Sequence, residues 1–370
     1  MTATPPSLSP RLEARLGISV PIIQSGMGGV AGPELAAAVS NAGGLGVLAA
    51  LRLQPDQVRA GIARMRELTD RPFGVNIWLH DDVRRPPDPD AISDDVVRGA
   101  QSVFNKFRPR FGLDARLDRP GPAADLVDAA LDVMIEERVP SFSAAIGVPE
   151  PELVARFHDA GGTVVAMVAT VEDALAAVAN GCDAVVAQGS ESGGHRSYGQ
   201  KHDRAGATGQ STLALVPQVV DAVGDRVPVL AAGGIVDGRG MAAMLALGAD
   251  GVLLGSRFVA TRESQASEMW KRRLTEGDRS TALTDGFTGQ WARVLRSEFT
   301  EAWEEAGNEA LPGLLQAAAG ADVIGAAKKN DDDQVQPLYA GAAVASMTGI
   351  PGAGEVVTQI AADAARILNR

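Results

Sequence analysis

Short apolar runs alternate with longer amphipathic segments along most of the chain. The apolar runs are three to five residues long and rich in Val, Ile and Ala. The segments between them have the spacing of helices and end in Gly or Asn-Gly, as helix C-caps commonly do. A strand buried on both faces and followed by a helix is typical of a parallel sheet. The pattern therefore predicts an α/β protein.

The apolar runs predict eight strands. They lie at residues 21–23, 46–49, 73–77, 141–144, 164–168, 184–188, 229–232 and 251–254. Eight such strand–helix units in residues 20–260 predict a (β/α)8 TIM barrel, with a doubly wound open sheet as the alternative.

Two stretches interrupt this rhythm. Residues 80–119 are rich in Pro and charge and predict a surface insertion before strand four. After strand eight, helical patterns around 266–274 and 298–306 predict a C-terminal cap segment, and residues 354–370 predict a final amphipathic helix of the outer ring. We therefore expect a barrel domain of residues 1–265 plus 345–370. Residues 266–344 would form a helical cap over the active-site mouth.

Composition narrows the class of protein. The chain has 370 residues, of which 45% are hydrophobic, enough for a large core and too many for disorder. A net charge of −12 argues against nucleic acid and anionic membrane surfaces as partners. No apolar stretch is long enough to span a membrane and no signal peptide is visible, so we expect a cytoplasmic protein. The single cysteine, Cys182, is expected to be a small core residue.

One histidine stands at a position suited to chemistry. His195 directly follows Gly193-Gly194, beyond the predicted strand 184–188. Ligands of parallel α/β proteins bind at the carboxyl ends of the strands, and imidazole titrates near neutral pH. The alternative is a solvated turn residue. The histidines at 80, 158, 195 and 202 lack metal-ligand spacing, so we expect no metal.

Two glycine turns predict a phosphate site. Gly233-Gly234 follows strand seven and Gly255-Ser256 follows strand eight. In barrels, backbone N–H groups after these strands converge on phosphate groups. FMN suits the site better than a nucleoside triphosphate, because no Gly-x4-Gly-Lys-Ser/Thr loop is present. The alternative is that these glycines serve only close helix packing.

The first strand and two amides add to this site. Gly26 and Gly28 begin a possible dinucleotide fingerprint, but no carboxylate follows the second strand, so we interpret them as a tight turn against a flat ligand. Asn76 and Gln188 stand at the ends of strands three and six. Their amides can donate and accept at a flavin edge, or they can cap neighbouring backbone.

Together these residues resemble the nitronate monooxygenase family, formerly called 2-nitropropane dioxygenases. The motifs that carry the resemblance are Gln24-Ser-Gly-Met27, Asn41-Ala-Gly-Gly-Leu-Gly46, Pro72-Phe-Gly-Val-Asn76, Ala187-Gln-Gly-Ser-Glu-Ser-Gly-Gly-His195, Ala232-Gly-Gly-Ile235 and Gly255-Ser-Arg-Phe258. The resemblance is close over residues 15–265 and implies a TIM barrel with FMN at the carboxyl ends of the strands and no metal.

The resemblance also implies roles for single residues. His195 matches the active-site histidine. The positions that match cofactor contacts are Gln24, Gly26, Met27, Asn76, Gln188, Gly193, Gly194, Gly233, Gly234, Gly255 and Ser256. Two positions depart from the family pattern: Ser256 replaces the more usual Thr, and Ser197 stands where Gly commonly follows His-Arg.

The activity implied is FMN-dependent oxidation of alkyl nitronates, and of nitroalkanes, with molecular oxygen to a carbonyl compound and nitrite. His195 would remove the α-proton of a neutral nitroalkane or hydrogen-bond its nitro oxygens. The expected partners are a small-molecule substrate and oxygen, and a homodimer is the assembly considered. One alternative is an FMN-dependent NAD(P)H oxidoreductase of the quinone reductase or enoyl-acyl carrier protein reductase type. Another is a non-redox phosphate-binding barrel enzyme.

Overall fold

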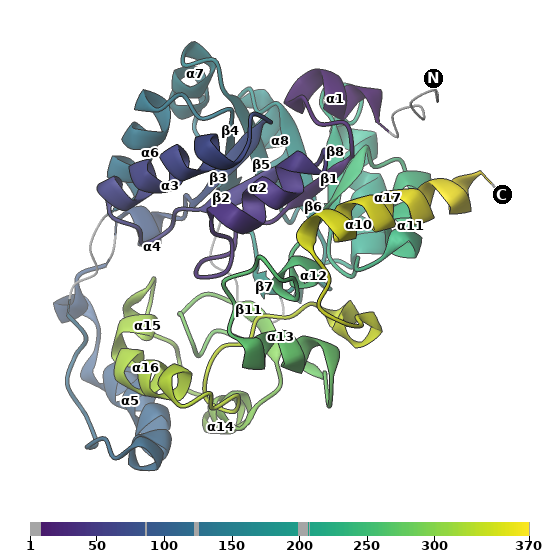
Figure 1. The fold of residues 1–370 in the computed structure, drawn as a ribbon. Helices are drawn as coiled ribbons and strands as arrows, with labels where there is room; N and C mark the ends of the chain where they lie inside the picture. The colour runs from purple at the N-terminus through teal and green to yellow at the C-terminus, as the bar shows by residue number, and fades with distance from the viewer. Residues whose placement is uncertain (1–8, 86, 122–125, 199–205, 207, 370) are drawn as a thin grey trace.

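Eight parallel strands form a nearly closed barrel with helices around it (Figure 1). The computed structural model describes residues 9–85, 87–121, 126–198, 206 and 208–369. The barrel strands are β1 (Ile22–Gln24), β2 (Gly46–Ala49), β3 (Phe73–Trp78), β4 (Ser141–Ala145), β5 (Thr163–Val168), β6 (Ala184–Gln188), β8 (Val229–Ala232) and β9 (Gly251–Leu254). Each lies within one residue of its predicted position. The predicted TIM barrel is confirmed.

The barrel closes between β1 and β2. The hydrogen-bonded order is β1-β9-β8-β6-β5-β4-β3-β2, so these two strands are the ends of the sheet. A single bridge between Ile23 and Leu45 joins them. The Gln24 amide adds two hydrogen bonds to the Val47 backbone, accepting from its N–H at 3.0 Å and donating to its carbonyl at 3.1 Å. The Gln24 side chain thus replaces part of the backbone hydrogen bonding that is missing between β1 and β2.

One helix packs outside the barrel after almost every strand. These helices are α2 (Pro33–Asn41), α3 (Pro55–Leu68), α6 (Val127–Glu136), α7 (Pro151–Asp159), α8 (Val171–Ala179), α10 (Thr212–Val223), α11 (Gly238–Ala246) and, at the end of the chain, α17 (Ala353–Leu368). Helix α17 packs against α11 and α2, so it completes the outer ring as expected. Packing is tight: a Cβ on Gly46 would lie 1.8 Å from the Ala36 carbonyl oxygen. Within the described ranges, every helix is too short or too polar to cross a bilayer.

A short N-terminal helix covers the amino ends of the strands. Helix α1 (Pro10–Leu16) contributes Leu12 and Leu16 to the apolar cluster inside the barrel, which includes Val47, Val186 and Leu230. Two further contacts, the ion pairs Arg11–Asp250 and Arg15–Asp183, join it to residues just before β9 and β6. Helix α1 therefore closes this end of the barrel.

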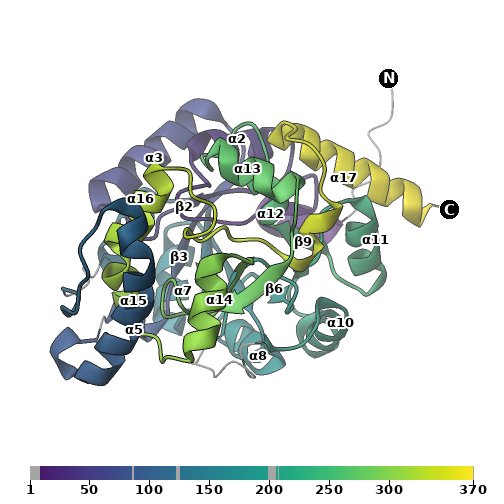
Figure 2. The same cartoon turned by 90° about the horizontal axis from the view of Figure 1, so that it is seen from below.

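The opposite end carries a cap with a hydrophobic core of its own (Figures 1 and 2). Before β4 the chain forms α4 (Asp81–Arg84), η1 (Pro89–Ala91), α5 (Asp94–Phe107) and η2 (Arg108–Phe111). After β9 it forms α12 (Ser256–Val259), α13 (Glu268–Thr275), α14 (Glu298–Ala306), α15 (Leu315–Ala319), α16 (Ala321–Lys329) and η3 (Ala342–Ser346). Phe104 and Phe107 of α5 pack on Phe299 of α14, with ring centroids 5.4 and 5.6 Å apart.

The insertion before β4 is therefore more than the surface excursion that its polar composition predicts. Its helix α5 buries one face against α14 and α15, because Val97, Ala100 and Val103 share that face with its phenylalanines. The two segments that build the cap core are far apart in sequence. The division into a barrel domain and a cap domain stays a prediction. The predicted bounds put α5 in the barrel domain, but its apolar face packs in the hydrophobic core of the cap.

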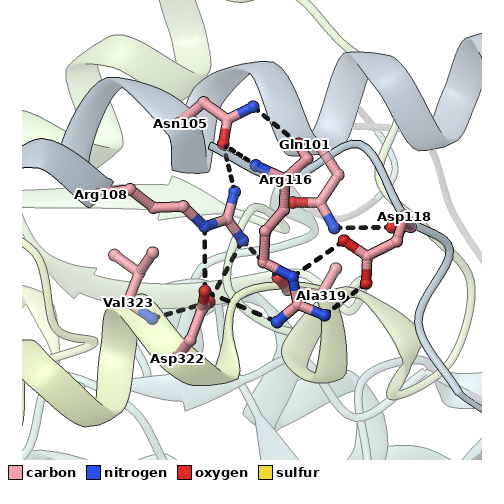
Figure 3. Close-up of polar contacts among 8 residues, drawn as sticks. All are labelled: Gln101, Asn105, Arg108, Arg116, Asp118, Ala319, Asp322 and Val323. Carbon is pink, nitrogen blue, oxygen red and sulfur yellow. Dashed lines mark hydrogen bonds and ion pairs between the residues drawn. The ribbon is translucent and has the colours of Figure 1, made fainter. Parts of the chain in front are cut away.

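A buried arginine joins these two segments (Figure 3). Arg108 is fully buried and donates to both carboxylate oxygens of Asp322 at 2.9 and 3.2 Å, and to the Ala319 carbonyl at 3.2 Å. Burial alone would raise the pKa of Asp322, but hydrogen bonds from Arg108 and from the Val323 N–H hold it below its usual value.

A small antiparallel sheet links the barrel to the cap. Strands β10 (Thr281–Thr284) and β11 (Ala292–Leu295) pair with each other, and β11 pairs with β7 (Gly194–His195), which follows β6. The sequence pattern did not predict this sheet. It brings His195 into register with Ala292 of the cap segment.

Candidate active site

Two glycine turns lie at the carboxyl ends of the paired strands β8 and β9. Gly233 and Gly234 have φ of +116° and +71°, a region that favours glycine, and a Cβ on Gly233 would lie 2.7 Å from Thr212 Oγ1. Within the described residues, the backbone N–H groups of Gly234, Gly255 and Ser256 have no hydrogen-bond acceptor. Free N–H groups on two neighbouring turns can bind an anion such as a phosphate.

The Gly193-Gly194 turn lies beside this site. A Cβ on Gly193 would lie 2.5 Å from the Gly341 nitrogen, and Gly341 N–H donates to Ser256 Oγ at 2.9 Å. A Cβ on Gly194 would meet nothing within 4 Å. Gly193 therefore permits the close approach of the segment after β11, whereas Gly194 borders open space.

The backbone around His195 is held by an amide of the barrel. The Gln188 side chain donates to the His195 carbonyl at 2.9 Å and accepts from the Ser197 N–H at 2.8 Å. The predicted alternative, an amide that caps neighbouring backbone, describes these contacts. Gln188 thus fixes the direction in which His195 leaves the strand end.

Two aromatic rings and one hydroxyl surround the imidazole. The Trp78 ring meets it edge to face, with centroids 4.4 Å apart, and the Tyr339 ring lies at 5.1 Å. Its Nε2 is 2.8 Å from Thr288 Oγ1. His195 is partly buried, so it is not a solvated turn residue.

The surroundings of His195 keep it neutral. Burial, together with the positive charge of Arg52, lowers the pKa of the imidazole to about 3. Burial likewise raises the pKa of Tyr339 to about 12, against the effect of Arg52. Both rings are therefore uncharged at neutral pH, and Arg52 is the charge that acts on both.

The predicted residues of the first and third strands also meet here. A Cβ on Gly26 would lie 2.3 Å from the Cβ of Asn76, and a Cβ on Gly255 would lie 3.7 Å from Met27 Sδ. Asn76 is buried and donates to Ser143 at 2.8 Å (carbonyl) and 3.1 Å (Oγ). Gln24 is fully buried and its amide bonds the β2 backbone, so it lies in the barrel wall below the turn.

Sequence reasoning missed three side chains around the imidazole. Trp78 stands two residues after Asn76 on β3, so the period of two along a strand could have placed both on one face. Thr288 and Tyr339 come from the cap segment, and no local pattern relates them to His195.

The other histidines and the cysteine have structural positions. His80 Nδ1 accepts from the Asp82 N–H at 3.2 Å, and His158 Nε2 lies 2.8 Å from an Asp183 oxygen. His202 lies outside the described residues. Cys182 is buried, as expected, and burial raises its pKa to about 12. In the part of the chain that the structure describes, His, Cys, Asp and Glu form no metal-ligand cluster.

Comparison with known proteins agrees with this geometry. The family model described as nitronate monooxygenase matches residues 9–363. The chain belongs to the nitronate monooxygenase family. The resemblance inferred from the sequence motifs is confirmed, and the match extends through the cap segment.

Relatives of this family are similar to the chain over most of its length. A probable nitronate monooxygenase from Staphylococcus saprophyticus is 35% identical over 303 residues, which are 82% of each chain. The crystal structure of a nitroalkane oxidase from Streptomyces ansochromogenes is 36% identical, covers 96% of this chain and 98% of its own, and has a TM-score of 0.86. FabK from Thermotoga maritima is 30% identical, covers 97% of both chains and has a TM-score of 0.75.

Proposed function

We propose that this protein is an FMN-dependent oxidoreductase that oxidises alkyl nitronates with molecular oxygen to a carbonyl compound and nitrite. The observation that carries the proposal is the neutral imidazole of His195, held between Trp78 and Tyr339 near glycine turns whose N–H groups can bind an anion. The similarity to a nitroalkane oxidase over nearly the whole chain supports it. The cytoplasmic location and the homodimer belong to the same proposal.

The residues present fit FMN. Its phosphate would lie on the N–H groups of Gly234, Gly255 and Ser256, which have no acceptor among the described residues. The flat ring would lie along the open space at Gly194, toward His195. The other predicted cofactor positions, Gln24, Gly26, Met27, Asn76, Gln188, Gly193 and Gly233, would shape this site. Bound FMN supplies the electron acceptor that the side chains here lack.

The hydrogen bonds around His195 leave one ring nitrogen available to accept a proton. The Thr288 hydroxyl donates to the Gln290 carbonyl at 3.2 Å, which leaves its oxygen to accept from Nε2–H of the imidazole. Nδ1 has no hydrogen-bond partner among the described residues. Its lone pair is then free to remove the α-proton of a neutral nitroalkane. A preformed nitronate needs no such base.

The test compares the two protonation states of one substrate. Wild-type protein should be yellow, consume oxygen and release nitrite with ethyl nitronate. His195→Asn should lower kcat/KM for nitroethane by about 100-fold or more, and for ethyl nitronate by less than about tenfold. Equal losses on both substrates would contradict the base role. A colourless protein that cannot be loaded with FMN would favour a non-redox barrel enzyme.

The similarity to FabK favours a second candidate, an FMN-dependent NAD(P)H oxidoreductase. Both candidates predict a yellow protein, so colour does not separate them. Anaerobic addition of NADH or NADPH separates the two candidates. Rapid bleaching of the flavin absorbance would overturn the nitronate monooxygenase proposal, and a stable spectrum that bleaches only with ethyl nitronate would support it.

A further inference from the structure

Arg52 adopts a backbone conformation that its side chain disfavours. Its φ is +66°, in the left-handed region where residues with a Cβ are uncommon. It stands in the turn after β2, at the carboxyl end of the barrel. Such local strain persists where the surrounding structure imposes it, and it is concentrated at functional sites.

The turn that carries Arg52 is anchored to the strand that reaches the imidazole. The Ala50 N–H donates to the Asn76 carbonyl at 3.0 Å, and the Leu53 N–H donates to the Ala50 carbonyl at 3.1 Å. Two residues after Asn76, Trp78 meets the His195 ring. The turn therefore stands at the same rim as His195. The effect of the Arg52 charge on the pKa of both His195 and Tyr339 agrees with this position.

The guanidinium of Arg52 is uncommitted. It makes no hydrogen bond or ion pair with the described residues; the residue as a whole is exposed, while burial around the charged group lowers its pKa. The other arginines near the site are engaged: Arg196 donates to the Gly189 carbonyl at 2.6 Å, and Arg293 donates to the Ser190 carbonyl at 2.9 Å. Arg52 is thus a cation beside the imidazole that is free to bind a ligand.

The protein needs such a cation if its substrate is an anion. The net charge of −12 repels anions at long range. A nitronate carries its negative charge on a planar O–N–O group, which has the shape of a carboxylate. The planar fork of arginine matches two such oxygens at once.

We propose that Arg52 recognises the O–N–O group of the nitronate and selects the ionised substrate over the neutral nitroalkane. This inference rests on the proposed function and names the residue that sets its preference. It makes Arg52 a specificity-determining residue, distinct from His195, which acts on the proton.

The test uses a matched pair of variants. Arg138 is also an exposed arginine with positive φ (+49°) and without a side-chain partner among the described residues, but it stands before β4 at the other end of the barrel. Arg52→Gln should raise KM for ethyl nitronate about tenfold or more and leave kcat within about twofold. Its KM for nitroethane should change less than about twofold. Arg138→Gln should change none of these values, and Arg52→Lys should lose less than Arg52→Gln.

The salt dependence of kcat/KM is a second measurement, and it would not change if Arg52 only supported the structure. Wild-type kcat/KM for ethyl nitronate should fall as sodium chloride rises, because salt screens an exposed charge. In Arg52→Gln this fall should be smaller. Equal KM changes for ethyl nitronate and nitroethane, or no change for either, would overturn the proposal.

Binding of nitrate, a planar oxyanion, separates this inference from the proposed function. Calorimetric titration of the FMN-loaded protein should give a Kd for nitrate that Arg52→Gln raises about tenfold and Arg138→Gln leaves unchanged. This result is required whether or not the enzyme oxidises nitronates. Absence of turnover with intact nitrate binding would reject only the proposed function. Absence of nitrate binding to the wild type, or equal binding to Arg52→Gln, would overturn the role of Arg52.

Discussion

At the scale of residues, one serine joins three strand ends through its hydroxyl and its backbone N–H. The Ser197 N–H donates to the Gln188 side chain. The Ser197 hydroxyl donates to the Met167 carbonyl and accepts from the Ile146 N–H at 2.9 Å. Ile146 has φ of +50°, a strained value for a β-branched residue. The family resemblance implies glycine as the common residue at the position of Ser197. Here the extra hydroxyl stabilises a turn after β4 that would otherwise leave a buried N–H unpaired.

Ser197→Ala should therefore destabilise the protein by about 1–3 kcal/mol, the cost of one buried donor left without an acceptor. Urea unfolding measures this free energy. Ser102→Ala is the control, because the Ser102 hydroxyl bonds the Gly99 carbonyl at an exposed position, and it should change stability by about 0.5 kcal/mol or less. Equal effects of the two substitutions would show that the Ile146 contact contributes nothing.

The glycine turns and His195 could be predicted because their signals are local. A Gly-Gly pair directly after an apolar run determines both where the strand ends and how closely a ligand can approach. The partners of His195 could not be predicted in this way. Thr288 and Tyr339 approach it only because β11 pairs with β7, a contact between residues about a hundred positions apart.

At the scale of elements, the barrel strands were predictable and the small sheet was not. Most residues of the barrel strands are buried, so each strand is mainly apolar and forms a short run that the sequence shows clearly. Strand β10 alternates buried and half-buried residues over four positions, and β7 has only two residues. Patterns this short do not distinguish a strand from a loop.

The same scale shows why Gln24 has more than one possible role. The family resemblance implies a cofactor contact for Gln24, while its amide completes the junction between β1 and β2. A buried leucine would leave both polar groups of Val47 without partners, so Gln24→Leu should cost about 2–4 kcal/mol of stability.

Unfolding of the flavin-free protein by urea measures this cost. Gln218→Leu is the control, because that amide bonds an exposed carbonyl of its own helix, and it should have little effect. Weaker flavin binding by Gln24→Leu without any loss of stability in the flavin-free protein would instead assign Gln24 to the cofactor alone.

At the scale of the whole molecule, the cap depends on two chain segments that meet away from the barrel. Arg108 of η2 and Asp322 of α16 are more than 200 positions apart and form a bidentate pair in the cap core (Figure 3). The side chain of Arg108 is fully buried, so it cannot exchange this partner for water. Removing Arg108 leaves the Asp322 carboxylate with only the longer ion pair to Arg116, at 3.6 Å, and takes away its buried partner.

Arg108→Met should therefore lower the free energy of unfolding by about 3–5 kcal/mol. Arg110→Met is the matched control: Arg110 pairs with Glu298 and Asp332 at the surface and should cost about 1 kcal/mol or less. Denaturant unfolding gives both values, and limited proteolysis of Arg108→Met should cut first within residues 92–118 or 287–335. An effect of Arg108→Met no larger than that of Arg110→Met would contradict this account.

The pairing of His195 with Ala292 has a consequence for exchanging parts between family members. Neighbouring residues of a strand point to opposite faces, so a shift of β11 by a single position would turn its side chains to the other face and displace Tyr339, which pairs with Val294 of β11, from the imidazole. A chimera that combines this barrel with a foreign cap must therefore preserve the length of chain between α13 and β11 as well as Thr288, which lies on that path and contacts the imidazole.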